Sequence, residues 1–271
     1  VKGIHFLLQK NKVQFLSGVG KIKGPGLVEV ALGDGTVQEV RAKDVIIATG
    51  AEPAVFPALG YDGDLVITSD EALELEEIPE HLIIVGGGVI GCEFASVFNR
   101  LGSEVSVIEM LPQLLPGEDQ RVGRTLQQAF KKAGIAVHVK TAVESAEGGG
   151  AGVALRLAGG AEVVAKCVLV AVGRRPVSAG LGYEEAGVEV GPGGFVVVDE
   201  TCRTSVDGVF AAGDVAGPPL LAHWAYHQGA VAAENAVTGS RLEVDRSVVP
   251  SCVFSSPEVA SCGLTEDRAK A

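Results

Sequence analysis

The sequence contains no Cys-x-x-Cys or Cys-x-x-x-x-Cys pair, although it has five cysteines among its 271 residues. The five are scattered along the chain, at Cys92, Cys167, Cys202, Cys252 and Cys262. The absence of paired spacings excludes a local redox disulfide and the usual cysteine-based metal motifs, so we expect no metal site. An odd number of separated thiols, most in apolar surroundings, indicates free cysteines in a reducing compartment and predicts a cytoplasmic location.

Long apolar runs and long basic runs are also absent. The longest apolar stretch, around residues 82–92, is interrupted by glycines and falls short of the roughly 20 residues that a membrane helix needs. Lysine and arginine number 22 against 34 aspartate and glutamate, a net charge of −12. This charge disfavours nucleic acid and anionic membranes as partners. A hydrophobic content of 47% favours a packed globular protein of about two domains.

Methionine is nearly absent too, since Met110 is the only one and the sequence opens at Val1. At the other end, Thr265, Glu266 and Asp267 have the pattern of a helix N-cap followed by an acidic first turn. The sequence stops four residues after Asp267, before such a helix has room to form. Both ends therefore predict that the chain is a fragment of a longer protein.

Residues 81–109 have the pattern of a dinucleotide-binding βαβ unit. An apolar strand at 82–85 leads into Gly86-x-Gly88-x-x-Gly91, a helix follows, and a second strand at 105–108 ends at Glu109. The apolar stripe expected for the helix comprises Ile90, Phe94, Val97, Phe98 and Leu101, and Gly102 is expected to end it. The surrounding strand–helix–strand pattern makes this glycine motif far more specific than the glycines alone.

Each part of this motif has a physical role in nucleotide binding. Gly86 permits a tight turn, Gly88 lets the backbone approach a pyrophosphate, and Gly91 lets helix and strand pack closely. The helix N-terminus presents unpaired N–H groups and partial positive charge to the phosphates. Glu109 follows Gly91 by 18 residues (109 − 91), where a carboxylate accepts hydrogen bonds from both ribose hydroxyls and repels a 2′-phosphate. The segment therefore predicts NAD rather than NADP.

The rest of the chain alternates between short strands and helices. A helix is expected at 1–11 and a Pro- and Gly-rich connector at 51–79. Strands are expected at 13–16, 27–32, 36–41, 44–48, 135–140, 167–172, 195–198, 208–214, 248–254 and 259–264, with a strand pair near 142–158 that turns at 147–152. Further helices are expected at 119–133 and 221–237. The alternation indicates an α/β fold.

Three further segments, IIATGAEP (46–53), AVGRRP (171–176) and SVDGVFAAGDVAGPPLLAH (205–223), accompany GGGVIGCE (86–93). Together these four motifs resemble the two-dinucleotide flavoprotein disulfide reductases, a family that includes dihydrolipoyl dehydrogenase, glutathione reductase and mercuric reductase. The likeness extends over essentially the whole chain. LLAH and PSCVFSSPEVASCGLTED (250–267) are most similar to dihydrolipoyl dehydrogenases. Glu109 disfavours the NADPH-using glutathione reductases, which carry basic residues there.

The resemblance implies a doubly wound NAD domain inserted into an FAD domain, followed by the start of an α+β interface domain. The implied ranges are 1–79 for the end of the first FAD segment (a β-meander) with its connector, 80–195 for the NAD domain, 196–244 for the returning FAD segment and 245–271 for a truncated interface domain. Members of this family are usually homodimers, so we expect a homodimer for the complete protein.

The resemblance also implies the cofactor contacts. Those to NAD are Gly86, Gly87, Gly88, Val89, Ile90, Gly91, Cys92, Glu93, Glu109, Val143 and Gly173. Those to FAD are Gly20, Thr49, Gly50, Ala51, Asp214, Leu220, Leu221, Ala222 and His223. Asp214 is expected to accept a hydrogen bond from the ribityl chain, and residues 220–223 to offer backbone groups to the flavin. Glu93 is similar to the family glutamate that reaches toward the flavin.

Three family elements are missing, and each would lie outside this chain: the FAD-binding βαβ unit, the Cys-x-x-x-x-Cys pair and the His-x-x-x-x-Glu base. No catalytic residue is therefore assigned here, and the chain alone is expected to be inactive. His5, His138, His223 and His227 are interpreted as surface or core histidines. The family helix after LLAH usually reads Lys-Ala-acid-acid-Glu-Gly, whereas this one reads WAYHQG (224–229).

For the complete protein, the resemblance implies electron transfer from dihydrolipoamide through a redox disulfide and FAD to NAD⁺. The implied partners are lipoyl domains of 2-oxo acid dehydrogenase or glycine cleavage complexes. One alternative is another NADH-linked disulfide reductase, such as a mercuric reductase. A second, from a different class, is a non-catalytic NAD-binding module, which needs no missing parts but leaves Asp214 and the ATG turn at 48–50 without a flavin to contact.

Overall fold

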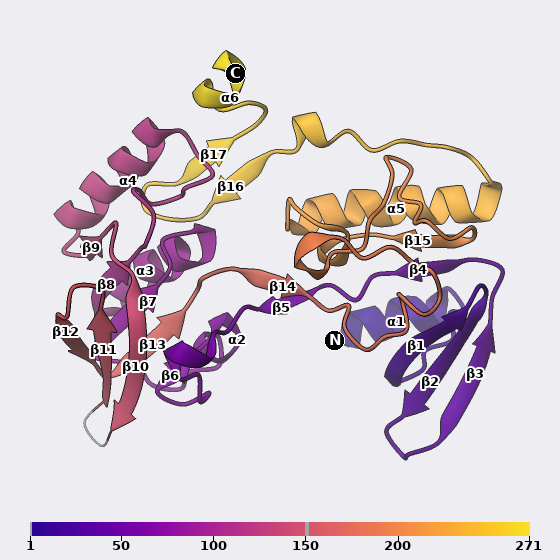
Figure 1. Cartoon of the computed structure of the whole chain (residues 1–271), viewed down its shortest axis with the longest axis horizontal. Helices are drawn as coiled ribbons and strands as arrows, with labels where there is room; N and C mark the ends of the chain where they lie inside the picture. The colour runs from indigo at the N-terminus through magenta and orange to yellow at the C-terminus, as the bar shows by residue number, and fades with distance from the viewer. Residues whose placement is uncertain (1, 150–151) are drawn as a thin grey trace. The chain divides into compact units, whose positions relative to one another are not determined.

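The computed structural model describes residues 2–149 and 152–271, and these form two compact units (Figure 1). Unit 1 consists of the residues up to 51 together with 176–245, and unit 2 consists of 52–175 together with 246–271. The chain passes between the units within β5 (Ala51–Pro53) and β14 (Arg174–Pro176), which pair with each other. Most of unit 2 is thus an insertion in the chain that forms unit 1.

The unit boundaries differ from the domain ranges expected at 79/80 and 195/196. Residues 52–79 belong to unit 2 because their strand β6 (Val66–Ile67) pairs in parallel with β13 (Cys167–Val170). Residues 176–195 belong to unit 1, where Tyr183 and Val188 are buried in its core. Residues 52–79 and residues 176–195 therefore each contribute packing residues to the unit in which they lie.

The centre of unit 2 is a five-stranded sheet in the order β6-β13-β7-β8-β9, with every pair parallel. Its other strands are β7 (His81–Val85), β8 (Glu104–Ile108) and β9 (Ala136–His138). Successive side chains of a strand point to opposite faces, and β7 shows this clearly. Leu82 and Ile84 pack with the helices, whereas Ile83 and Val85 pack with the strands of an antiparallel meander. The three layers confirm the predicted α/β class.

The helix layer of unit 2 contains α3 (Val89–Leu101) and α4 (Gln120–Lys132). Gly102 ends α3 as predicted, with a left-handed φ of 104°. The predicted apolar stripe of α3 is partly wrong, because Val97 and Leu101 are about half exposed. The buried face consists instead of Gly91, Cys92, Ala95, Ser96 and Phe98. The mostly small side chains on this buried face allow the helix axis to approach the sheet closely. The small size of these residues therefore identifies the buried face of α3 better than their hydrophobicity does.

The meander layer consists of β10 (Val143–Gly149), β11 (Gly152–Leu157) and β12 (Glu162–Ala165). Of the turn predicted at 147–152, residues 150 and 151 lie outside the described residues. Val153 and Leu155 of β11 are fully buried against the sheet. The meander therefore closes the sheet face that the helices leave open.

The C-terminal segment packs on the helix layer of unit 2. Its strands β16 (Ser251–Val253) and β17 (Val259–Ser261) form an antiparallel hairpin, and α6 (Glu266–Lys270) follows. Val253 is 1% exposed within the core around α3. Thr265 caps α6 by accepting a hydrogen bond from the Arg268 N–H at 3.4 Å. A short helix thus forms where the sequence was expected to end too early for one.

Unit 1 combines a three-stranded antiparallel meander with a pair of parallel strands and a long helix. The meander is β1 (Gly18–Gly24), β2 (Leu27–Leu32) and β3 (Val37–Arg41), the parallel pair is β4 (Val45–Ile47) and β15 (Val209–Ala211), and the helices are α1 (Lys2–Lys10) and α5 (Ala222–Thr238). The short helical turns of unit 1 are η2 (Pro192–Gly194) and η3 (Asp214–Ala216), whereas η1 (Pro57–Leu59), α2 (Ser69–Ala72) and η4 (Arg246–Val248) belong to unit 2.

Two predicted strands of unit 1 are absent. Residues 13–16 have no strand partner, and Val13 and Phe15 are more than half exposed. Residues 195–198 contribute a single bridge, between Val190 and Val196. Apolar residues of strand type are present at both places, but a strand also requires a neighbour with free backbone groups. Elsewhere, no helix in the described part of the chain is long and apolar enough to cross a bilayer.

Acid is expected to destabilise unit 2 through Glu71, which closes the capping box of α2. Hydrogen bonds from Thr68 and Tyr61 lower the pKa of Glu71 from 4.5 to about 2. Because the folded-state pKa is the lower one, this stabilisation is complete above 4.5 and is lost as the pH falls toward 2. Urea unfolding at a series of pH values should give a shallower acid dependence for Glu71→Gln than for the wild type. The neighbouring variant Glu74→Gln should retain the wild-type slope, and equal slopes for all three proteins would contradict the assignment.

Candidate functional site

The glycine motif forms a tight turn between β7 and α3, and its backbone is closely packed. Gly86 has a φ of 113°, and its N–H donates to the Ile108 carbonyl at 2.8 Å. A Cβ atom on Gly86 would lie 2.3 Å from the Ala171 carbonyl oxygen, and one on Gly91 would lie 2.0 Å from the Gly86 oxygen. Both glycines are therefore required by the protein's own backbone. This agrees with the turn and packing roles predicted from the sequence.

Gly88 differs from these two because nothing lies against it. A Cβ atom built there meets no heavy atom within 4 Å. Gly88 is the N-cap residue of α3 and makes no side-chain cap hydrogen bond, so the first-turn N–H groups of the helix are available to an external acceptor. Open space beside uncapped N–H donors and partial positive charge fits a pyrophosphate.

Glu109 follows β8 and faces the same turn. Its carboxylate accepts hydrogen bonds from the N–H groups of Gly87 and Leu111, both at 2.6 Å. The residue is 6% exposed, and its backbone is fixed between His138 and Thr141. A buried carboxylate held by two backbone donors is a rigid acceptor with lone pairs left for a ligand. The structure thus places Glu109 directly against the glycine turn, as the βαβ pattern predicted.

Two residues that the sequence analysis did not identify complete this turn. The Leu115 N–H donates to the Gly87 carbonyl at 2.8 Å, and Leu115 adopts a left-handed φ of 50°. Leu114 is fully buried, and its Cδ2 would be 2.6 Å from a Cβ on Gly87. Both lie after β8 in an ordinary-looking loop, so no local sequence signal distinguishes them. Leu114 and Leu115 therefore fix the position of Gly87 between the two outer glycines of Gly86–Gly88.

Cys92 and Glu93 follow the motif on α3, and they have different surroundings. The Cys92 thiol is buried and donates to the Gly87 carbonyl at 3.4 Å. The Glu93 carboxylate accepts a hydrogen bond from the Phe254 N–H at 2.8 Å. Further along α3, the Ser96 hydroxyl accepts a hydrogen bond from the Ser256 N–H at 3.1 Å, and Arg100 donates to the Ser256 hydroxyl. Glu93 therefore helps to attach the C-terminal hairpin to the nucleotide-binding helix.

Native-state alkylation is expected to separate the five cysteines into two groups. Burial raises the pKa of Cys92 to about 12 and that of Cys167 to about 11, and Cys202 is also buried. Cys252 and Cys262 are exposed. Because the thiolate is the nucleophile, iodoacetamide should label only the exposed pair before unfolding and all five afterwards. Peptide mass spectrometry reads this out directly, and labelling of Cys92 as fast as Cys252 would contradict the described packing.

The remaining residues expected to contact NAD lie in unit 2 but are less enclosed. Val89 is 39% exposed at the start of α3, and Ile90 is half-buried beside it. Val143 begins β10 and packs against the meander core. Gly173 is exposed with a φ of 128°, and its carbonyl accepts a hydrogen bond from the Ala54 N–H. Their contacts with a nucleotide stay predictions.

The residues expected to contact FAD all lie in unit 1. Gly20 is exposed in the middle of β1. Thr49 donates its hydroxyl proton to the Val177 carbonyl at 2.6 Å, and Gly50 accepts from the Val177 N–H at 2.9 Å. Gly50 has a φ of 75° with no heavy atom within 4 Å of a built Cβ, and Ala51 follows it into β5. The turn at 49–51 is thus rigid and has open space on one side.

Asp214 and the start of α5 form the other part of this region. Asp214 is half-buried at the first position of η3, and its carbonyl closes that turn with Gly217. Residues 220–223 lead into α5, whose N-cap residue, Leu221, has no side chain that caps it. The start of α5 therefore has no side-chain cap, and the partial positive charge of this helix end suits an electron-rich ligand group. The open turn at Gly50 and this uncapped helix end fit a flavin nucleotide.

Two buried residues of α5, Trp224 and Gln228, were not predicted as site residues. Gln228 is fully buried, and its Oε1 accepts a hydrogen bond from the Gly213 N–H at 3.0 Å, which positions the residue before Asp214. The Gln228 Nε2 and the Trp224 Nε1 are buried, and neither has a hydrogen-bond partner in the described part of the chain. Buried donors rarely stay unpaired. Tyr183, 4% exposed and 3.3 Å from the Thr49 hydroxyl, was also missed.

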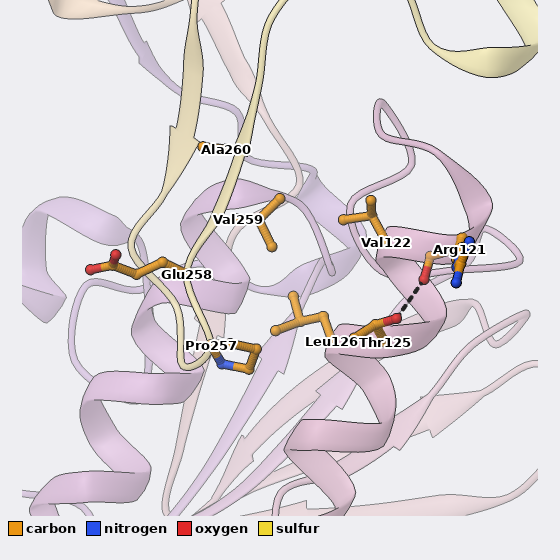
Figure 2. Close-up of a pocket in the computed structure, with 8 residues that line it drawn as sticks. All are labelled: Arg121, Val122, Thr125, Leu126, Pro257, Glu258, Val259 and Ala260. Carbon is orange, nitrogen blue, oxygen red and sulfur yellow. Dashed lines mark hydrogen bonds between the residues drawn. The ribbon is translucent and has the colours of Figure 1, made fainter.

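A cavity of about 350 Å³ lies between α4 and the C-terminal hairpin. It is lined by Arg121, Val122, Thr125, Leu126, Pro257, Glu258, Val259 and Ala260. Figure 2 shows Leu126 pointing toward Pro257 and Val259 across it. None of the predicted nucleotide contacts lines this cavity. The described ranges also contain no cluster of three or more His, Cys, Asp or Glu side chains arranged to hold a metal ion.

Comparisons with known proteins agree with this site. The family described as pyridine nucleotide-disulphide oxidoreductase matches residues 1–229. Dihydrolipoyl dehydrogenase 3 of Pseudomonas aeruginosa is 42% identical over 275 residues, covering 100% of this chain and 58% of that protein. Dihydrolipoyl dehydrogenase of Chlorobaculum tepidum is 42% identical over 272 residues, and the match covers 99% of this chain and 58% of that protein. The chain thus spans less than two thirds of these relatives.

Solved structures show the same relationship. LpdA from Mycobacterium tuberculosis superposes with a TM-score of 0.92 at 32% identity, covering 98% of this chain and 59% of that one. A variant of RclA, an HOCl-induced flavoprotein disulfide reductase from Escherichia coli, superposes with a TM-score of 0.92 at 29% identity, covering 99% of this chain and 61% of that one. Both superpositions confirm the predicted flavoprotein reductase fold.

Proposed function

The chain belongs to the pyridine nucleotide-disulphide oxidoreductase family, and on this basis we propose that the complete protein is a dihydrolipoyl dehydrogenase using FAD and NAD⁺. The observation that carries the proposal is the buried carboxylate of Glu109 at the glycine turn, in a chain that matches dihydrolipoyl dehydrogenases along its whole length. The overall reaction oxidises the two thiols of dihydrolipoamide to a disulfide, reduces NAD⁺ to NADH and releases one proton.

In this proposal unit 2 holds NAD. The open space at Gly88 and the uncapped start of α3 support pyrophosphate binding by residues 86–93. The two hydrogen bonds to Glu109 support a fixed acceptor for the adenosine ribose. Val143 is assigned to the adenine side and Gly173 to the nicotinamide half. Since a carboxylate repels a 2′-phosphate, Glu109 favours NAD over NADP.

Unit 1 holds FAD in the same proposal. The open turn at 49–51 and the uncapped start of α5 support contacts from Thr49, Gly50, Ala51 and residues 220–223. Asp214 is assigned to the ribityl chain and Gly20 to the far side of the cofactor. FAD supplies two-electron transfer between a dithiol and the nicotinamide. This chain's own residues bind and orient the cofactors, and the redox cysteines and the histidine base are assigned to the rest of the protein.

The proposed partners are dihydrolipoamide groups on lipoyl domains of 2-oxo acid dehydrogenase or glycine cleavage complexes. This assignment is supported by the names of the relatives. A homodimer is proposed for the complete protein on the family resemblance, and a cytoplasmic location on the scattered spacing of the five cysteines. The net charge of −12 supports neither nucleic acid nor an anionic membrane as a partner.

The test is steady-state turnover of the protein expressed from its complete coding sequence. NADH formation from NAD⁺ is measured with dihydrolipoamide, and disulfide or metal reduction by NADH is measured with glutathione disulfide and with mercuric ion. Turnover with dihydrolipoamide, much faster with NAD⁺ than with NADP⁺, is the expected result. Faster reduction of mercuric ion would assign the protein to another disulfide reductase, an alternative for which the similarity to RclA is the supporting observation. NADH binding without any turnover would indicate the non-catalytic module.

A further inference from the structure

The turn that presents Asp214 is held by a side chain of α5. This turn follows β15, and α5 lies beside that strand (Figure 1). The Gly213 N–H donates to the Oε1 of Gln228 at 3.0 Å. The preceding Ala212 N–H donates to the Ile47 carbonyl, also at 3.0 Å. The first hydrogen bond attaches the turn to α5, and the second attaches it to β4.

The side chain of Gln228 has a fixed position and a fixed orientation. The residue is fully buried, so the surrounding packing holds its rotamer. Its own carbonyl accepts a hydrogen bond from the Cys202 thiol at 3.8 Å, which attaches this point of α5 to the segment before β15. Because a backbone N–H can only donate, the side-chain oxygen of Gln228 must be the atom that faces Gly213. The amide is therefore a rigid acceptor for one residue of the turn.

Gly213 is the point at which the turn needs such an acceptor. It lies immediately before Asp214 and has a φ of 77° and a ψ of −157°. Glycine populates many backbone conformations, so a rotation at Gly213 would move the Asp214 carboxylate unless a hydrogen bond opposes it. A larger residue could not stiffen the turn instead, because a Cβ on Gly213 would lie 3.2 Å from the Ala225 Cβ.

We propose that Gln228 is a positioning residue for FAD, because its side-chain oxygen holds the Gly213 N–H and thereby keeps the Asp214 carboxylate in place for the ribityl hydroxyls. This inference rests on the FAD site proposed for unit 1. Gln228 acts through the turn and not on the cofactor, since it is fully buried within the chain. An acceptor that is ordered before the ligand arrives reduces the entropic cost of binding. The family pattern has glutamate at this place, which also offers a side-chain oxygen.

The test is the FAD affinity of the protein expressed from its complete coding sequence, measured by titrating FAD into the apoprotein and following flavin fluorescence. Gln228→Met removes the acceptor but keeps an unbranched, adaptable side chain. Its FAD affinity is expected to fall about fivefold, because a hydrogen bond contributes about 1 kcal/mol. NADH affinity should not change. Gln228→Glu retains an oxygen acceptor and should bind FAD within about twofold of the wild type, which tests the inference even if Gln228→Met does not fold.

A double-mutant cycle separates positioning from general support of the fold. On an Asp214→Ala background, Gln228→Met should cause no further loss of FAD affinity, because the carboxylate that Gln228 positions is gone. Val231→Ala is the matched control, since Val231 is also buried on α5. Its smaller side chain should lower the stability of the protein and leave FAD affinity within about twofold of the wild type.

Three results would overturn the inference while leaving the FAD site in place. These are wild-type FAD affinity for Gln228→Met, additive losses in the cycle, and a loss of fivefold or more for Gln228→Glu. A wild-type protein that binds no FAD would overturn the inference and the proposed FAD site together. The two failures are therefore distinguished by the wild-type titration.

Discussion

Replacing Glu109 with alanine is expected to weaken NADH binding by about 10- to 100-fold and to remove the discrimination against NADPH. A hydrogen bond to a charged group contributes about 1.5–3 kcal/mol, and each 1.4 kcal/mol corresponds to about tenfold in affinity. The variant also leaves the Gly87 and Leu111 N–H groups without their acceptor. Because the Gly87 N–H is buried and the Leu111 N–H is partly buried, we expect a further loss of about 1–3 kcal/mol in the free energy of unfolding.

Fluorescence titration with NADH and NADPH measures the first effect, and thermal unfolding without nucleotide measures the second. Glu104→Ala is the matched control, because Glu104 is an exposed glutamate at the opposite end of the same strand, β8. It should bind both nucleotides like the wild type. If Glu109→Ala and Glu104→Ala have the same NADH affinity, Glu109 does not hold the ribose.

Replacing Gly91 with alanine should destabilise the protein by about 3 kcal/mol, although alanine is the better helix former. Helix propensity alone would favour the change by about 1 kcal/mol. However, the new Cβ would lie 2.0 Å from the Gly86 carbonyl oxygen and 3.3 Å from the Ile84 side chain. Neither β7 nor the tight turn can move without disturbing the sheet, so the overpacking cost dominates. Chemical denaturation of the complete protein measures the difference.

Gly88→Ala provides the contrast that separates folding from binding. No heavy atom lies within 4 Å of a Cβ built on Gly88, so its stability should stay within about 1 kcal/mol of the wild type. NADH binding should nevertheless fall by at least about tenfold, because the methyl group takes the space that close backbone approach to the pyrophosphate requires. A stable Gly91→Ala protein, or a Gly88→Ala protein with unchanged NADH affinity, would contradict these roles.

The parts of the site that the sequence predicted are those whose signals are local. The glycine motif and Glu109 lie within one βαβ unit. The tight turn and the close packing require glycine for steric reasons, and the ribose hydroxyls require a carboxylate for electrostatic reasons. The Gly102 helix end was predictable for the same reason. The nucleotide contacts themselves stay predictions, but the turn geometry and the buried carboxylate agree with them.

The parts that were missed depend on partners distant in the chain. Leu115 contacts Gly87, Gln228 contacts Gly213, and nothing in the local sequence pairs these residues. The strands predicted at 13–16 and 195–198 were wrong because a run of strand-forming apolar residues indicates a suitable side-chain pattern but not an available neighbouring strand. The stripe on α3 was misread because the helix packs through small residues, which periodicity in large apolar residues does not detect.

The insertion of residues 52–175 also has a consequence during synthesis. β4 ends at Ile47, but its partner strand β15 begins only at Val209, so β4 leaves the ribosome long before its partner exists. All five strands of the parallel sheet of unit 2 have been synthesised once the ribosome has passed Val170, the last residue of β13. We expect the nucleotide-binding sheet to form first. Its folding then brings residues 51 and 176 together in β5 and β14, which shortens the loop that β4 and β15 must close.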